Sequence, residues 1–477
     1  MEITVSKKDV FWSYAAQFFN LATGLITLPL ILKLLNSDEV GLNYILISIN
    51  SIVALFDLGF SGQFSRYLTY IFSGAQKIQK EGISEDYNDN INEHLLACTI
   101  KTAKRIYLII SIVASVFLIT FGTWYVYGVT NGFSLIHNAL LVWCIFCASS
   151  FFNIYFLYFN AFLQGRGLVK ETKQAQVCSR LCQITLTFIL LFAGYGLLSV
   201  VIANLIAPFV LRFFAYKKFY TRDIKDIVSR NKVCNYEIKE IFAILWHNAK
   251  KMGVIGVLSS AIGYASTLVI GSYLSLSDVA SYGLMVQIVG IITGVATIHF
   301  YSLVPKLSYL MVKKDYVEMR RHFGISIFSF LIISGLGAIA IICAVPLFEL
   351  CDFNTQFPSY TIIVLFYLYK FAEQNQSIFS QLFLLGNDLR FYKSAVWTGL
   401  FSFVSLWLSL VLGFGLAGVV ISQSIPLYVY AAWKWPIDAV IIYKISPVKD
   451  LLICPYYEIK KFVHEKYFRE KKLHSTS

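Results

Sequence analysis

The chain has 477 residues, of which 57% are hydrophobic and only 14% are charged, and its mean hydropathy is +0.65. A soluble globular protein has about one quarter charged residues, so this composition excludes an ordinary soluble domain and indicates a polytopic membrane protein. The formal net charge of +13 could suit nucleic acid, but the placement of the basic residues, described below, is explained by membrane topology, and no nucleic-acid partner is expected.

Twelve apolar segments of about 20 residues follow one another along the chain, and each is long enough to cross a bilayer as a helix. Strands of a membrane barrel would be about 10 residues long with strict alternation of apolar and polar residues. The predicted fold class is therefore an all-α polytopic membrane protein. The predicted spans are residues 12–35, 40–60, 106–128, 139–162, 176–194, 196–216, 252–273, 279–303, 324–348, 359–386, 392–412 and 415–433.

Lysine and arginine residues mark one side of the membrane. If the chain has twelve spans, all of its lysine and arginine residues except Lys33 and Lys370 lie in the N-terminus, in the C-terminal tail or in every second connection between spans. Because basic residues gather on the cytoplasmic side, both termini are expected in the cytoplasm. The nine cysteines are scattered and predict no disulfide framework.

A weak internal repeat has an offset of 239 residues, close to half the chain. Glu39-Val40-Gly41 aligns with Asp278-Val279-Ala280. Six spans in each half give both copies the same orientation, as in a parallel repeat about an axis along the membrane normal. The predicted organisation is a six-helix bundle in residues 1–216, a basic cytoplasmic linker in 217–248, a second six-helix bundle in 249–433 and a basic cytoplasmic tail in 434–477.

The span 359–386 carries a polar stripe near its middle. Its members lie on one face of a helix: Lys370, Glu373, Gln374, Ser377 and Gln381. A lysine at the bilayer centre costs roughly 3 kcal/mol on insertion scales, so this face does not point into lipid. Either Lys370 and Glu373 form a structural ion pair between helices, or the face lines a water-filled cavity.

Similar stripes occur in five other spans. The first span contributes Gln17 and Asn20, and the fourth contributes Asn153 and Asn160. A single polar residue would join helices by a hydrogen bond, but matched stripes in both halves favour a hydrophilic cavity between two bundles, as in an alternating-access transporter. The candidate substrate-binding residues are Lys370, Arg66, Gln374, Asn153, Asn160, Gln17 and Asn20.

Two kinds of charged group would act in such a cavity. Lys370 and Arg66 make it cationic and suited to an anionic ligand such as a phosphate, although Arg66 could simply extend to the membrane interface. Asp57, Glu373 and His299 are candidates for coupling to protons or cations. A pair with Arg66 is the alternative for Asp57, and packing is the alternative for His299.

The common catalytic and cofactor motifs do not occur in the chain. The sequence has no G-x-x-x-x-G-K-[ST], H-E-x-x-H or G-x-S-x-G motif and no local Cys/His spacing typical of a metal site. We therefore expect no catalytic residues, no metal and no cofactor, and a protein that is not an enzyme.

The N-terminal region resembles bacterial O-antigen flippases of the Wzx type, in the polysaccharide-transporter branch of the superfamily that includes MATE multidrug exporters. The resemblance lies in Trp12-Ser-Tyr-Ala-Ala-Gln-Phe-Phe-Asn20, Leu28-Pro-Leu-Ile-Leu-Lys-Leu-Leu35, Glu39-Val-Gly-Leu42, Asp57-Leu-Gly-Phe60 and Arg66-Tyr-Leu-Thr-Tyr-Ile-Phe-Ser-Gly74. It implies a MATE-like fold and a cationic lumen, for which Lys370 and Arg66 are the candidates.

The resemblance also implies a substrate and a location. These are an undecaprenyl-pyrophosphate-linked oligosaccharide and the bacterial inner membrane, where the unit would move from the cytoplasmic to the periplasmic face. Membrane lipids, an O-antigen polymerase and a chain-length regulator are the implied partners. A cation-coupled multidrug exporter of the same fold is one alternative, and a membrane enzyme of glycan assembly is another.

Overall fold

The computed structural model describes residues 26–79, 90–312, 315–350, 354–385 and 392–458, together with Trp12, Phe19, Thr23, Gly24 and Asn88. Two compact units divide the chain, Met1–Ala280 and Ser281–Ser477. The boundary falls near the start of one long helix. The division into four regions that the sequence suggests, including the linker at 217–248, stays a prediction.

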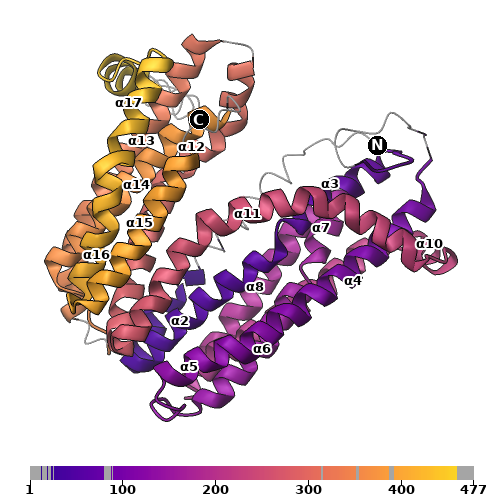
Figure 1. Ribbon diagram of the computed structural model, residues 1–477, viewed down its shortest axis with the longest axis horizontal. Coiled ribbons are helices and arrows are strands. Elements are labelled where there is room, and N and C mark those ends of the chain that lie inside the picture. Colours follow the sequence, from indigo (N-terminus) through magenta and orange to yellow (C-terminus); the bar gives the residue numbers. More distant parts are fainter. Residues whose placement is uncertain are drawn as a thin grey trace, which may run out of the picture. The chain divides into compact units, whose positions relative to one another are not determined.

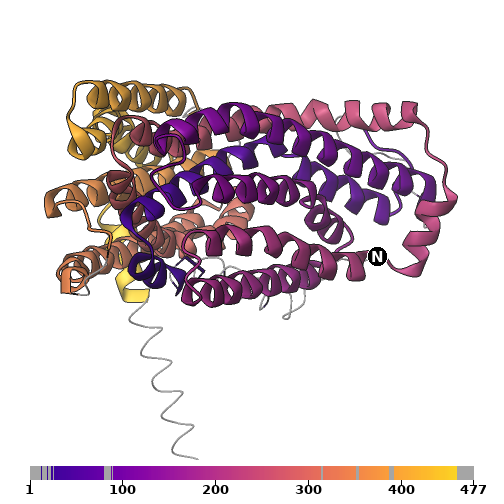
Figure 2. The ribbon, with the colours of Figure 1, turned by 90° about the horizontal axis from the view of Figure 1, so that it is seen from below.

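The first unit is a bundle of long helices that run side by side (Figures 1 and 2). Residues 26–34 are helical. The elements that follow are α2 (Ser37–Ala54), η1 (Leu55–Asp57), α3 (Phe60–Phe72), α4 (Glu93–Phe117), η2 (Leu118–Gly122), α5 (Thr123–Val129), α6 (Ala139–Tyr155), α7 (Tyr158–Gly165), α8 (Val169–Phe192), α9 (Leu198–Phe219), α10 (Arg222–Arg230) and α11 (Asn235–Tyr273).

The second unit is also helical, and its long helices pack along one another (Figure 1). Helix α12 (Leu276–Val312) spans the boundary between the units. The remaining elements are α13 (Tyr316–Leu350), α14 (Tyr360–Leu385), α15 (Tyr392–Val411), α16 (Gly415–Pro426), η3 (Leu427–Ala431), α17 (Ala432–Ile442) and η4 (Lys449–Ile453).

The prediction of an all-helical, multi-pass membrane protein is confirmed. Nine helical segments among the described residues are long and apolar enough to cross a membrane, and they correspond to nine of the twelve predicted spans. The other three predicted spans are 12–35, of which ten residues lie outside the described ones, 252–273, which lies within α11, and 359–386, which corresponds to α14.

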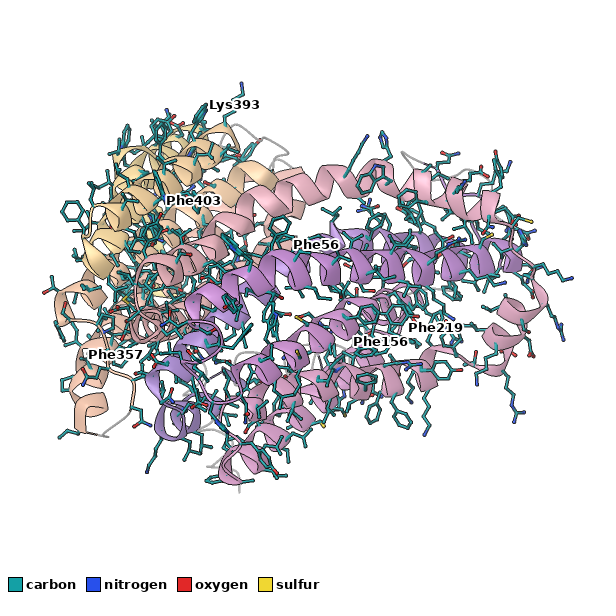
Figure 3. The ribbon with its side chains drawn as sticks, turned by 60° about the horizontal axis from the view of Figure 1, so that its bottom comes forward. Phe56, Phe156, Phe219, Phe357, Lys393 and Phe403 are labelled. Atoms are coloured by element: carbon teal, nitrogen blue, oxygen red, sulfur yellow. The ribbon has the colours of Figure 1, made fainter. Side chains whose placement is uncertain are left out.

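Aromatic side chains fill the interior of each unit. In the first unit Phe60, Phe64 and Tyr107 are almost completely buried, and Phe156 and Phe219 belong to the same packed interior (Figure 3). In the second unit the buried cluster includes Phe300, Phe323, Phe330, Phe379 and Phe383.

The outer faces of the helices are apolar as well. On α4 the exposed residues Ile109, Ile112, Val113 and Val116 recur at helical spacing and form one stripe. A soluble protein would bury such a stripe, but here the surrounding lipid is as apolar as the side chains. The helices therefore need no polar outer face, which explains the low content of charged residues.

The internal repeat marks the starts of two corresponding helices. At the start of α2, Asn36 Oδ1 accepts from the backbone N–H of Glu39 at 2.7 Å, and Glu39 Oε2 accepts from the N–H of Asn36 at 3.2 Å. At the start of α12, Ser275 and Asp278 exchange the same kinds of bond at 3.2 Å each. Each pair is a capping box that satisfies free N–H groups, so the matched acidic residues fix where each of the two helices begins.

Glycine permits one close approach between these two helix starts. A Cβ atom on Gly41 of α2 would lie 2.0 Å from the carbonyl oxygen of Leu276. Real Cβ atoms do not come so close to an oxygen, so only glycine fits where α2 passes the start of α12.

Candidate functional site

The polar stripe predicted on 359–386 is present on α14, and its two charged members form an ion pair. Lys370 Nζ lies 2.7 Å from Glu373 Oε2, one turn further along the helix. Lys370 is about 15 Å from the start of this 26-residue helix. The two charged groups therefore form an ion pair within α14, near the middle of the predicted span.

Aromatic rings complete the surroundings of the ammonium group. Lys370 Nζ lies 5.1 Å from the ring centre of Tyr369 and 5.9 Å from that of Phe366, both within the range of cation–π attraction. The Tyr369 hydroxyl donates to Glu373 Oε1 at 3.4 Å. Gln374 is half-buried beside them.

The pair is not sealed within the unit. The side chains of Lys370 and Glu373 are 27% and 35% exposed. A buried pair with no access could only hold helices together, whereas an exposed ammonium group keeps N–H donors for an incoming anion. Lys370 is thus partly accessible, and its role in binding an anionic ligand stays a prediction.

The first unit contains a second cation in the middle of a helix of spanning length. Arg180 lies 11 residues into α8, or about 16 Å along the helix. Its Nη1 donates to Gln183 Oε1 at 2.7 Å. Gln183 Nε2 in turn donates to Oδ1 of Asn204 on α9.

The predicted residue Asn153 belongs to this network. Its Nδ2 lies 3.5 Å from the carbonyl oxygen of Asn204 and 2.9 Å from that of Ser149. The network thus joins α6, α8 and α9 through side-chain amides and ends on a guanidinium group.

Arg180 was not among the predicted candidates, because it was counted with the cytoplasmic connection before the fifth span. Helix α8 begins at Val169, earlier than the predicted span. A local signal was available: Arg180 and Gln183 are one turn apart, where the polar first half of α8 meets its apolar second half.

Asn160 and Arg66 lie outside this network. Asn160 is on α7, beyond a kink near Phe156, and its Oδ1 is buried without a hydrogen-bond partner in the described part of the chain. Arg66 is exposed on α3. Gln17 and Asn20 lie outside the described residues.

Two candidates for coupling have distinct surroundings. Asp57 accepts from the hydroxyls of Tyr107 at 2.6 Å and Ser61 at 2.8 Å, so among the described residues its partners are these two and not Arg66. His299 is half-buried on α12 and lies within electrostatic range of His322.

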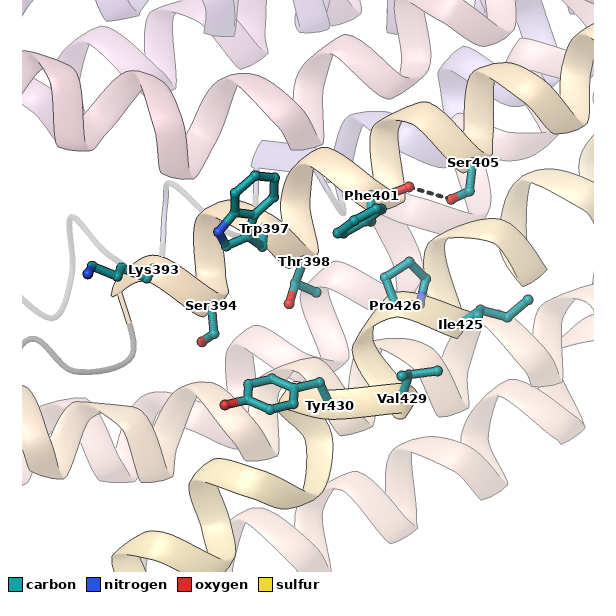
Figure 4. A pocket seen from close by; sticks show the side chains of 10 residues that line it. All are labelled: Lys393, Ser394, Trp397, Thr398, Phe401, Ser405, Ile425, Pro426, Val429 and Tyr430. Carbon is teal, nitrogen blue, oxygen red and sulfur yellow. Dashed lines mark hydrogen bonds between the residues drawn. The ribbon is translucent and has the colours of Figure 1, made fainter.

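A groove on the outer surface of the second unit was not predicted. It has a volume of about 620 Å³ and lies between α15 and the chain from α16 into η3. Trp397 and Phe401, which are 60% and 61% exposed, line it together with Val429 and Tyr430, and Lys393 stands at one end (Figure 4).

Proline shapes this groove. Pro426 has no N–H to donate to the carbonyl of Ser422, one turn earlier, and the helix continues through the wider turn η3. The Ser405 hydroxyl of α15 lies 2.8 Å from that carbonyl oxygen and 2.7 Å from Phe401 O (Figure 4). A side chain of α15 thus satisfies the acceptor that proline leaves free.

Comparison with known proteins identifies the fold. The sequence matches no family model and no curated protein. The structure is similar to "Lipid II flippase MurJ, inward closed conformation", with a TM-score of 0.63 and 17% identity, covering 94% of this chain and 90% of that one.

Two transporter structures are also similar. One is the inward-facing conformation of a multidrug resistance MATE family transporter of the MOP superfamily, with a TM-score of 0.59, 14% identity and coverage of 90% and 94%. The other is a mutant of the Vibrio cholerae MATE transporter VcmN, with a TM-score of 0.54, 15% identity and coverage of 92% and 96%. The chain therefore has the multi-helix MATE-like fold and is a multi-pass membrane protein.

Proposed function

We propose that the protein is a flippase that moves an undecaprenyl-pyrophosphate-linked O-antigen oligosaccharide from the cytoplasmic to the periplasmic face of a bacterial inner membrane. The observation that carries the proposal is the partly exposed Lys370–Glu373 pair in the middle of an apolar helix. The MATE-like fold and the resemblance of the N-terminal motifs to O-antigen flippases support it.

The pyrophosphate is the part of this substrate that needs cations. Lys370 in the second unit and Arg180 in the first each place a positive charge about halfway along a helix of spanning length. Charge-assisted hydrogen bonds to phosphate oxygens are roughly twice as strong as neutral ones. In this proposal the bound pyrophosphate competes with Glu373 for Lys370, while Arg180 stays oriented by Gln183.

The oligosaccharide and the lipid chain need different surroundings. Amides such as Asn153 and Gln374 suit sugar hydroxyls because they both donate and accept. The apolar groove beside Trp397 and Phe401 suits a polyprenyl chain. Rocking of residues 1–216 against 249–433 would then carry the headgroup of the substrate across the membrane while its polyprenyl chain stays in the lipid.

Complementation tests the proposal. In a bacterium that lacks its own O-antigen flippase, the wild-type gene should restore surface O-antigen, and Lys370→Ala should abolish it while the protein still inserts into the membrane. Lys434→Ala is a matched control, because it removes a similar pair, Lys434 Nζ to Asp438 Oδ1 at 3.0 Å, from α17. Normal surface O-antigen in the Lys370→Ala strain would remove this residue from the mechanism.

A cation-coupled exporter of amphipathic drugs is the second candidate, because one of the similar structures is a multidrug resistance MATE family transporter and another is a MATE transporter. Asp57, Glu373 and His299 would then couple the transport to protons or cations. Drug accumulation in cells with and without the protein distinguishes the two: lower accumulation without any effect on lipid-linked intermediates would favour the exporter.

A further inference from the structure

Three potential metal ligands, His94, Cys98 and Glu237, meet where α4 begins and α11 begins, and Cys234 is adjacent to Glu237. His94 and Cys98 are four residues apart and share one face of α4. Cys234 immediately precedes α11, and Glu237 lies in its first turn. Helix α11 packs against α4 (Figure 1), so residues about 140 positions apart in the sequence become neighbours.

The distances suit a single small cation. His94 Nε2 lies 2.7 Å from Glu237 Oε1, and Cys98 Sγ lies 3.8 Å from Glu237 Oε2. One ligand atom from each of His94, Cys98 and Glu237 lies within 4.8 Å of the others. Tetrahedral zinc with bonds of about 2.0–2.3 Å needs ligand atoms roughly 3–4 Å apart, so side-chain adjustments of about 1 Å would complete such a site.

A fourth ligand is close at hand. The backbone N–H of Cys234 donates to Glu237 Oε2 at 2.7 Å, so Cys234 lies next to one ligand of the three-residue group. Two hydrogen bonds join α4 to the chain around the start of α11: Lys101 Nζ donates to Asn231 O, just after α10, at 2.8 Å, and Arg105 Nη1 donates to Asn235 Oδ1 of α11 at 2.6 Å. The surrounding backbone is thus fixed before any metal binds.

We propose that His94, Cys98, Cys234 and Glu237 form a zinc-binding site that clamps α4 to the start of α11. A donor set of imidazole nitrogen, thiolate sulfur and carboxylate oxygen is the set that Zn²⁺ prefers. Each cysteine binds as a thiolate and releases its proton to water, so the affinity rises with pH. The site lies away from Lys370 and Arg180 in the sequence and does not depend on the proposed transport activity.

Metal binding by the purified full-length protein tests the proposal. Zinc alone is added to metal-free protein in detergent, in competition with a chromophoric chelator, and one zinc ion per chain is expected. Co²⁺ in place of zinc should give the absorption of a tetrahedral thiolate complex. Loss of an outer-shell partner already costs 10–100-fold in metal affinity, so Cys98→Ser and His94→Ala should weaken binding at least about 100-fold.

The controls separate a built site from adventitious binding. Cys343→Ser removes an exposed cysteine of the second unit and should leave zinc affinity unchanged. Equal affinities of wild type and Cys98→Ser, or no thiolate band with Co²⁺ in the wild type, would overturn the proposal. The Co²⁺ spectrum of the wild type decides the matter even where a variant fails to fold. Unchanged affinity in Cys234→Ser would overturn the assignment of the fourth ligand.

Discussion

The hydroxyl of Tyr107 donates a 2.6 Å hydrogen bond to Oδ1 of Asp57. Asp57 ends η1, three residues before the first residue of α3, and its carboxylate also accepts from the backbone N–H of Ser61 at 3.3 Å. A carboxylate at this place accepts from a free N–H group of the first helical turn, and its negative charge interacts favourably with the positive end of the helix dipole. Tyr107, buried on α4, thereby fixes the junction between α2 and α3.

Replacing Tyr107 with phenylalanine should destabilise the first unit. The change keeps the ring but removes the donor, and hydrogen bonds to charged groups contribute about 1.5–3 kcal/mol to stability. The thermal unfolding midpoint in detergent should fall by several degrees. The control is Tyr127→Phe, at an exposed position, which should leave the midpoint unchanged. Equal midpoints for the two variants would show that the Asp57 contact contributes little.

A double substitution separates structural and functional roles of the Lys370–Glu373 pair. Removing one partner leaves an uncompensated charge at membrane depth, whereas removing both does not. Lys370→Ala/Glu373→Ala should therefore restore the stability lost in Lys370→Ala. Because the ammonium group is proposed to bind the pyrophosphate, the double variant should still fail to display O-antigen. Recovery of both stability and transport would show that the pair is structural only.

Arg180 provides an independent test of the cationic headgroup site. Arg180→Gln keeps a polar side chain beside Gln183 but removes the charge, so insertion should be normal and O-antigen display should fall at least about tenfold, the equivalent of about 1.4 kcal/mol. Arg230→Gln, at the end of α10, is the matched surface control. Quantitative blotting of surface glycan and membrane protein makes the comparison. Undiminished display in Arg180→Gln would leave Arg180 with a packing role.

Two glycine-to-alanine substitutions should have opposite effects on stability. At Gly41 the added Cβ would lie 2.0 Å from Leu276 O. The free energy of unfolding of this variant should therefore fall by more than about 1–3 kcal/mol, or the variant should fail to accumulate in the membrane. At Gly62, on α3, nothing lies within 4 Å of an added Cβ. Alanine there should stabilise the helix by about 0.4–1 kcal/mol, since it restricts the unfolded chain. Unfolding midpoints and membrane yields test both. Normal stability of Gly41→Ala would show that α2 and the start of α12 separate readily.

The sequence predicted the helices well because their signals are local. Long apolar runs mark spans, and nine of the described helical segments meet the same criteria of length and composition. The repeat was detectable for the same reason: Glu39 and Asp278 each complete a capping box within three residues of the chain. Lys370 and Glu373, one turn apart on α14, were likewise recognisable as a candidate pair.

The partners of the polar residues required the tertiary structure. Arg66, nine residues away, was the partner considered for Asp57 from the sequence, but the hydroxyl partner Tyr107 lies on α4. Arg180 belongs to a network through Asn204 on another helix, and His94 meets Glu237 across 143 residues. Helix formation depends on neighbours three or four positions away, which the sequence displays. Contacts between helices depend on which faces pack together, and only the folded chain decides that.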